Sequence, residues 1–164
     1  MQEQYLWKKA GWFRREYTLT RGSEQLARLV FRGWGSGATV EMPGGSWEIR
    51  KAGLWKPRVS VLRPGTEWTA KAHWSGNYDL ETPVEGAFRW RCLSMWKMRY
   101  GWTAFDGTPL IRYRPLGWSH CTHAVEFLDE QPLTDPRLVL TILGGYLLAL
   151  AQEELAAVSV VVAS

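Results

Sequence analysis

One uninterrupted apolar segment, LVLTILGGYLLALA from Leu138 to Ala151, restricts the folds that this chain can adopt. Its large apolar side chains fall on every side of a helix, and a helix that is apolar all round must be buried all round. Asp135 and Pro136 precede it, and these residues are typical of an N-cap and of a first helical position. The pattern therefore predicts a hydrophobic helix over about residues 135–153.

The same segment has an alternative interpretation as a membrane anchor. A spanning helix needs about 20 predominantly apolar residues, whereas the segment Leu138–Ala151 has only 14 residues. An extension of this segment would place Gln152, Glu153 and Glu154 in lipid, where charged groups are costly. We therefore expect no transmembrane segment.

The chain before residue 134 alternates between apolar and polar residues, which is the pattern of half-buried strands. In EWTAKAHW one face of the predicted strand carries Trp68, Ala70, Ala72 and Trp74. A later run places Trp96, Met98, Tyr100 and Trp102 on one face in the same way. Turn signals such as GWGSG, MPGGS, RPGT and FDGT separate the runs. We predict ten to twelve short strands and no other helix.

One arrangement buries the apolar surfaces of both kinds of element. The strands turn their apolar faces inward and surround the helix on all sides. The predicted fold is mainly β: a closed antiparallel β-barrel of about 10–12 strands around the central C-terminal helix, as a single domain over residues 1–164. In this arrangement Gly144 and Gly145 mark the points where large side chains, above all Trp, approach the helix backbone.

This order of elements, ending in the capped apolar helix DPRLVLTILGGYLLALA, resembles the tubby C-terminal-like superfamily, which includes tubby proteins, phospholipid scramblases and LURP-one-related proteins. The resemblance covers about Trp12 to Glu154 and rests on element order, not on a binding motif. It implies a phosphoinositide- or membrane-associated binding role. A scramblase role is less well supported, because nothing here matches the acidic calcium-binding segment of those proteins. The lipid-binding basic residues of tubby have no residue-by-residue match.

Composition narrows the setting of the protein. The chain has 20 Lys and Arg against 16 Asp and Glu, a mild excess, and eleven Trp, which is an unusually large number. Only two cysteines occur, Cys92 and Cys121, and the start of the sequence has no apolar segment typical of a signal peptide. We expect a cytoplasmic protein, with attachment to the membrane periphery as an open alternative.

The basic residues form a candidate ligand site when two hairpins are aligned by their turns. An Asp106-Gly107 turn pairs Trp102 with Ile111, and a loop over Leu93–Met95 pairs Trp90 with Met98. Three adjacent strands then present six basic side chains outward, with Arg91 opposite Lys97 and Arg99 next to both Arg89 and Arg114. The predicted ligand-binding residues are Arg89, Arg91, Lys97, Arg99, Arg112 and Arg114.

Like charges directly opposite each other are unfavourable, so this face needs compensation. Either an anionic ligand supplies it, or acids on neighbouring strands do, such as Glu81 or Glu126. Because the aromatic residues alternate inward in this interpretation, the partner expected is an anionic phospholipid headgroup or an acidic protein, and nucleic acid is not expected.

Catalytic and metal sites have little support. No nucleophile elbow or phosphate-binding loop occurs, and GWGSG precedes a strand, not a helix. Cys121 and His123 share a strand face, with Cys92 as a candidate third ligand, but packing of these positions into the core is the better explanation. We expect no catalytic residue, metal or cofactor.

The predicted function is a non-enzymatic binding module; the alternatives are a structural or protein-interaction domain and, third, an enzyme. Residues 155–164 are rich in Val and indicate a strand or packed tail more than further helix.

Overall fold

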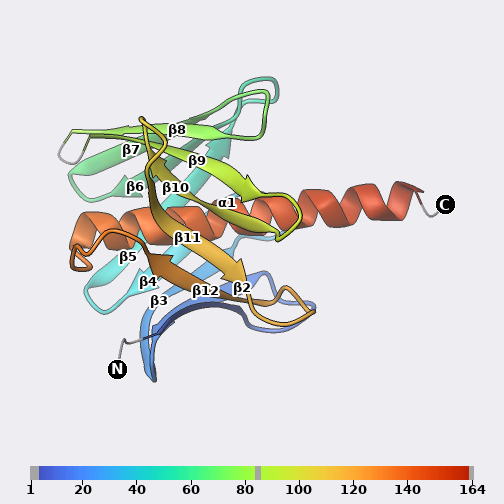
Figure 1. Cartoon of the computed structure of the whole chain (residues 1–164), viewed down its shortest axis with the longest axis horizontal. Helices are drawn as coiled ribbons and strands as arrows, with labels where there is room; N and C mark the ends of the chain where they lie inside the picture. Colours follow the sequence, from blue (N-terminus) through green and yellow to red (C-terminus); the bar gives the residue numbers. More distant parts are fainter. Residues whose placement is uncertain (1–3, 84–85, 163–164) are drawn as a thin grey trace.

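Twelve antiparallel strands form a closed barrel in the computed structural model, which describes residues 4–83 and 86–162. Each strand pairs with the next along the chain, and β1 pairs with β12 to close the barrel (Figure 1). The strands are β1 Tyr5–Lys9, β2 Glu16–Arg21, β3 Glu24–Phe31, β4 Ala38–Met42, β5 Gly45–Ala52, β6 Arg58–Arg63, β7 Thr66–Ala72, β8 Tyr78–Thr82, β9 Gly86–Ser94, β10 Arg99–Ala104, β11 Pro109–Pro115 and β12 Thr122–Phe127. The predicted antiparallel barrel is confirmed.

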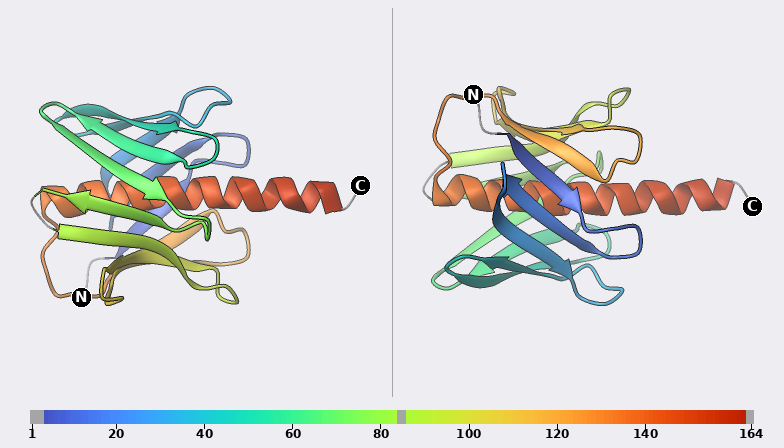
Figure 2. Two further views of the ribbon diagram at one scale, coloured as in Figure 1. Left: turned by 90° about the horizontal axis from the view of Figure 1, so that it is seen from above. Right: turned by 90° about the horizontal axis from the view of Figure 1, so that it is seen from below.

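The single helix, α1 Asp135–Val162, runs along the barrel axis (Figure 2). Its residues from Val139 to Leu150 are buried on all sides by the inward-facing side chains of the strands. The barrel wall supplies large side chains to this core, with Trp7, Trp90 and Trp102 among the most deeply buried. The predicted position of the helix inside the barrel is confirmed, and the strand alternation and the all-round apolar helix explain each other.

Gly144 and Gly145 lie where the barrel wall comes closest to the helix. A Cβ atom on Gly144 would lie 2.6 Å from Nε1 of Trp102 and 2.7 Å from the hydroxyl of Tyr113. A Cβ atom on Gly145 would lie 2.5 Å from the ring of Trp7. Real side chains do not approach so closely, so both positions require glycine, as predicted from the sequence.

Two hydrogen bonds from the wall fix the helix along the axis. The indole N–H of Trp102 donates to the carbonyl of Leu140 at 2.9 Å, and the hydroxyl of Tyr113 donates to the carbonyl of Thr141. Thr141 itself donates to the carbonyl of Arg137 at 2.7 Å, one turn earlier. Polar groups buried in a core are costly unless they are paired, and these bonds pair the polar side-chain groups of Trp102, Tyr113 and Thr141.

The start of the helix is held by ion pairs at one end of the barrel. Arg63, at the end of β6, forms a forked pair with Asp135 at 2.7 and 3.0 Å. This hydrogen-bonded guanidinium holds the pKa of Asp135 below its ordinary value. Arg137 is buried and donates to Asp129 and to the carbonyl of Gln131. The helix therefore begins at a fixed position relative to the strands.

The far end of the helix differs from the prediction. The expected strand or packed tail over residues 155–164 is wrong for residues 155–162, because α1 continues without interruption to Val162. Residues 163–164 lie outside the described part of the chain. Adding residues to an existing helix costs little compared with starting one, and the low helix propensity of Val is a penalty of only about 0.5 kcal/mol per residue. By length and composition alone, Asp135–Val160 is also long and apolar enough to cross a membrane, although core helices pass the same test and 67% of its most apolar window is buried.

Candidate functional site

The predicted basic face depends on how β9, β10 and β11 are aligned. Between β10 and β11 the predicted pairing of Trp102 with Ile111 is confirmed. Between β9 and β10 the prediction is wrong by four residues, because Trp90 pairs with Trp102 and not with Met98. The loop occupies residues 95–98, beyond the turn that the sequence suggested.

The corrected alignment separates the like charges that motivated this site. Arg89 lies opposite Thr103, and Arg91 lies opposite Gly101. Neither arginine faces a basic residue across the β9–β10 pair. The predicted repulsion between these two strands is therefore not present.

Three of the six predicted residues are neutralised by acids on neighbouring strands. Arg112 and Arg114 donate to opposite oxygens of Glu126 at 2.5 and 2.8 Å. Burial alone would raise the pKa of Glu126, but hydrogen bonds from Arg114 and Arg112 hold it below its ordinary value. Arg89 forms a forked pair with Asp79 at 2.6 and 3.0 Å. The sequence had suggested Glu126 and Glu81 as candidate acids; the structure uses Glu126 and Asp79.

The other three, Arg91, Lys97 and Arg99, have no acidic partner among the residues that the structure describes. Lys97 lies in the β9–β10 loop, and Arg99 begins the strand that follows it. Nε of Arg99 is buried and lacks a hydrogen-bond partner in the described part of the chain. The unneutralised half of the predicted cluster thus lies toward the end of the barrel at which the β9–β10 loop turns.

The eleven tryptophans fall into two sharply separated groups. Five belong to the barrel core and are at most 6% exposed: Trp7, Trp47, Trp68, Trp90 and Trp102. The other six are at least 76% exposed: Trp12, Trp34, Trp55, Trp74, Trp96 and Trp118. Large aromatic side chains usually bury much of their surface, so the exposed group requires an explanation outside the fold.

Every exposed tryptophan occupies a different loop, and all six loops lie at the same end of the barrel. They are residues 10–15, 32–37, 53–57, 73–77, 95–98 and 116–121, which connect each odd-numbered strand to the next even-numbered one. Since successive strands are antiparallel, these connections share one end. We call it the tryptophan end.

The two ends of the barrel differ in charge as well. The six loops of the tryptophan end contain no Asp or Glu, and they contain Arg14, Arg15, Arg32, Lys56 and Lys97. The connections at the opposite end contain no Trp and include Asp106, Asp129 and Glu130. The loops of the tryptophan end therefore carry exposed indoles and basic residues, and the acidic loop residues lie in the connections of the opposite end.

Helix α1 leaves the barrel through the tryptophan end and extends past the loops (Figures 1 and 2). Its segment Leu155–Val162, here called the helix tip, contains no charged residue. Leu155, Val158, Val160 and Val162 are 46–82% exposed. The helix tip thus emerges at the end of the barrel formed by the six loops that carry the exposed indoles.

A polar collar marks the point where the helix emerges. Glu153 pairs with Arg15 at 2.8 Å, and Glu154 lies 3.8 Å from Lys51 on β5. Gln152 donates to the carbonyl of His120 at 3.2 Å. These contacts tie three consecutive helix residues to the wall, so the helix tip projects from a fixed base.

The exposed tryptophans were missed in the sequence because the alternation continues beyond the strands. Trp74 keeps the phase of Trp68 but follows the end of β7, and Trp96 keeps the phase of Trp102 but lies in a loop. The expectation that these two indoles and Met98 point into the core is wrong. Both indoles are exposed, and Met98 lies in the same loop as Trp96, half-buried and outside the core. A usable signal existed, because positions 12, 34, 55, 74, 96 and 118 recur every 19–22 residues, the length of one hairpin with its connection.

The positions of Cys92, Cys121 and His123 in the structure do not support a metal site. No group of three or more His, Cys, Asp or Glu that could hold a metal ion occurs in residues 4–83 and 86–162. His123 is buried in β12 opposite Trp7, with its ring 3.4 Å from Gln152. Cys92 and Cys121 are both free thiols.

His123 predicts a specific acid sensitivity. Burial, with a smaller contribution from His120, lowers the pKa of His123 from 6.5 to about 4. The unfolded chain therefore binds one more proton than the folded chain between these values, and stability is lost as the pH falls from about 6.5 toward 4, by up to about 3 kcal/mol. Urea unfolding at a series of pH values should show this loss, and His123→Gln should remove most of it. An identical pH dependence in both proteins would contradict the assignment.

Comparison with known proteins gives no further guide: no family model, curated protein or solved structure matches this chain. The resemblance to the tubby C-terminal-like superfamily stays a prediction, and function must be argued from the site itself.

Proposed function

We propose that this protein is a non-enzymatic binding module that attaches peripherally to anionic phospholipid membranes through its tryptophan end. The observation that carries the proposal is that six exposed indoles, one in each loop, lie at the same end of the barrel as the exposed apolar helix tip. Tryptophan favours the membrane–water interface, where the ring lies among apolar chains and the N–H remains hydrated.

The helix tip distinguishes a bilayer from other partners. Leu155, Val158 and Val162 offer aliphatic surface, which hydrocarbon covers and nucleic acid does not. The tip spans about 12 Å at 1.5 Å per residue, which is comparable to the depth of about 5–10 Å at which apolar faces of interfacial helices are buried. A protein partner would need a socket shaped to a projecting helix and six indoles, whereas a bilayer needs no matched shape.

The charge distribution favours an anionic surface. Lys56 and Lys97 lie in the loops of the tryptophan end without an acidic partner among the described residues. Arg14 lies in another of these loops and interacts electrostatically with Glu16. Basic residues near an anionic membrane each contribute about 1 kcal/mol of attraction, which decays within a Debye length. The proposed partner is therefore still an anionic phospholipid, as in the prediction from the sequence. The proposed contact surface is now the loops of the tryptophan end instead of the outward strand face.

Vesicle flotation tests this function. Binding of the wild-type protein should rise with the fraction of phosphatidylserine in phosphatidylcholine vesicles and fall with added salt, with a residual apolar contribution at high salt. A protein that floats with no vesicle of any composition would refute the proposal. If such a protein also formed a dimer in solution, the interaction-domain alternative would replace it.

A further inference from the structure

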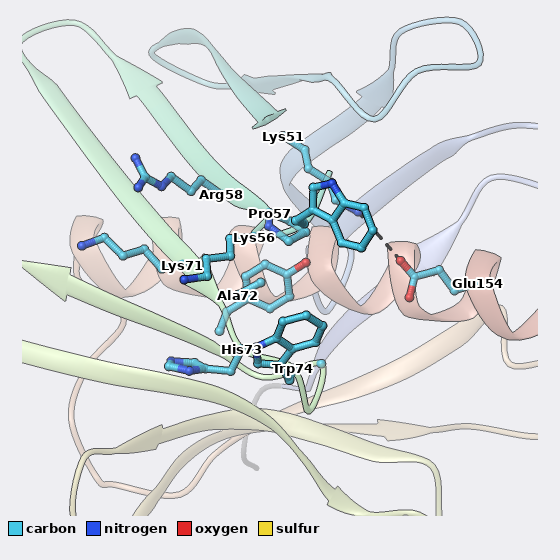
Figure 3. A pocket seen from close by; sticks show the side chains of 12 residues that line it. Lys51, Lys56, Pro57, Arg58, Lys71, Ala72, His73, Trp74 and Glu154 are labelled. Carbon is cyan, nitrogen blue, oxygen red and sulfur yellow. Dashed lines mark ion pairs between the residues drawn. The ribbon is translucent and has the colours of Figure 1, made fainter. Parts of the chain in front are cut away.

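One hollow at the tryptophan end is lined by several basic residues and by two of the exposed indoles (Figure 3). Its volume is about 510 Å³, and it lies between the β5–β6 and β7–β8 loops. Trp55 and Trp74 are these indoles, and Lys56, Arg58 and Lys71 supply positive charge. Lys51 lines the same hollow, but its amine is directed at Glu154.

Three of these cations have no acidic partner in the part of the chain that the structure describes. Arg58 and Lys71 are direct neighbours across the β6–β7 pair, and both are exposed. Lys56 lies two residues before Arg58, in the loop. Like charges opposite each other on a sheet are unfavourable, so this arrangement is stabilised when an anion binds between them.

Asp79, the acid that could neutralise Lys71, is hydrogen-bonded to Arg89 and His73 instead. Asp79 lies opposite Lys71 across the β7–β8 pair. Its carboxylate instead accepts two hydrogen bonds from Arg89, and it lies 2.6 Å from Nε2 of His73. The bond from Arg89 is the main cause that holds the pKa of Asp79 below its ordinary value. The neighbouring charges are paired, and within the hollow Lys51 is paired with Glu154, which also lines it. Lys56, Arg58 and Lys71 are the cations of the hollow that have no acidic partner among the described residues.

We propose that this hollow binds a phosphomonoester. A phosphomonoester carries a charge of about −1.5 to −2 near neutral pH and has three strong acceptor oxygens. One forked guanidinium and two amines match that charge and those acceptors better than they match the single charge of a phosphodiester. The ligand is either the headgroup of a monoester lipid or a free phosphorylated metabolite, and the lipid source rests on the proposed membrane function.

The test compares two triple variants that remove equal charge from the same end of the barrel. One replaces Lys56, Arg58 and Lys71 with Ser. The matched control replaces Arg14, Arg91 and Lys97, which are also exposed. Arg91 and Lys97 have no acidic partner among the described residues, and Arg14 interacts electrostatically with Glu16. Flotation uses vesicles of phosphatidic acid, a monoester, and of phosphatidylserine, a diester, adjusted to equal zeta potential.

Wild-type protein and the control should prefer phosphatidic acid, and the hollow variant should lose that preference by at least about tenfold, equivalent to about 1.4 kcal/mol. Calorimetric titration with glycerol 3-phosphate covers the soluble source: binding by the wild type and not by the hollow variant supports the site even if vesicle binding fails. Equal losses in both variants, or no preference for phosphatidic acid together with no binding of glycerol 3-phosphate, would overturn the phosphomonoester site. Binding to phosphatidylserine vesicles would still stand in that case, so the proposed function is judged separately.

Discussion

Replacing Leu143 with Lys should prevent folding. Leu143 is fully buried in the middle of α1, at 0% exposure, with the barrel wall on all sides. A lysine there must either bury a charge or lose its proton, and either outcome costs several kcal/mol. Since a domain of this size is stable by about 5–15 kcal/mol in total, circular dichroism and urea unfolding should show a chain that is largely unfolded.

The same change farther along the helix provides the control. Val158 is 61% exposed in the helix tip, so Val158→Lys introduces the same charge into the same helix without burial. Its free energy of unfolding should stay within about 0.5 kcal/mol of the wild type, as for other surface substitutions. A folded Leu143→Lys variant with near-wild-type stability would contradict the central-helix fold.

The fold was predictable because burial imposes a strong pattern on both partners. A helix without a polar face demands cover on every side, and strands with one apolar face demand a core. Gly144 and Gly145 were predictable for the same reason, since a wall of large side chains leaves no room for a Cβ there. These inferences depend only on which side of an element is apolar.

The points at which elements end were not predictable in the same way. The phase of an alternating pattern does not reveal where a strand stops, so Trp74 and Trp96 were assigned to the core. The β9–β10 register failed for a related reason, because its loop lies beyond the turn inferred from local residues. Misplacing loop tips hid the candidate site, because the exposed tryptophans are all at loop tips.

The helix tip was missed for a different reason. Val-rich sequence favours strands when it is considered alone, but Leu155–Val162 follows a helix that the barrel already holds in place. The contacts of Glu153 with Arg15 and of Glu154 with Lys51 hold the last helical turn before α1 leaves the barrel. The residues that follow continue this helical conformation. Tertiary context thus overrode local propensity, and it left an apolar surface in solvent that propensity gave no reason to expect.

Replacing Trp34, Trp96 and Trp118 with Ser should weaken membrane attachment strongly and leave the fold intact. Each of these side chains is at least 99% exposed, so its removal takes no contact from the core, and stability should change by less than about 0.5 kcal/mol per site. If each indole contributes on the order of 1 kcal/mol when it is partly buried in the interface, the triple variant should bind anionic vesicles about 100-fold more weakly.

The matched control is Phe105→Ser, which removes an exposed aromatic residue from the β10–β11 connection at the opposite end of the barrel. Its vesicle binding should equal that of the wild type.

Tryptophan fluorescence adds a second measurement to flotation. When the wild-type protein binds vesicles, the emission of the six exposed indoles should shift toward blue, while the five core indoles stay in the same environment. Wild-type affinity in the triple variant, with no emission shift in the wild type, would show that the tryptophan end does not contact the bilayer. An equal loss of binding in Phe105→Ser would instead show that attachment does not depend on which end carries the aromatic residue, and the proposed orientation would fail.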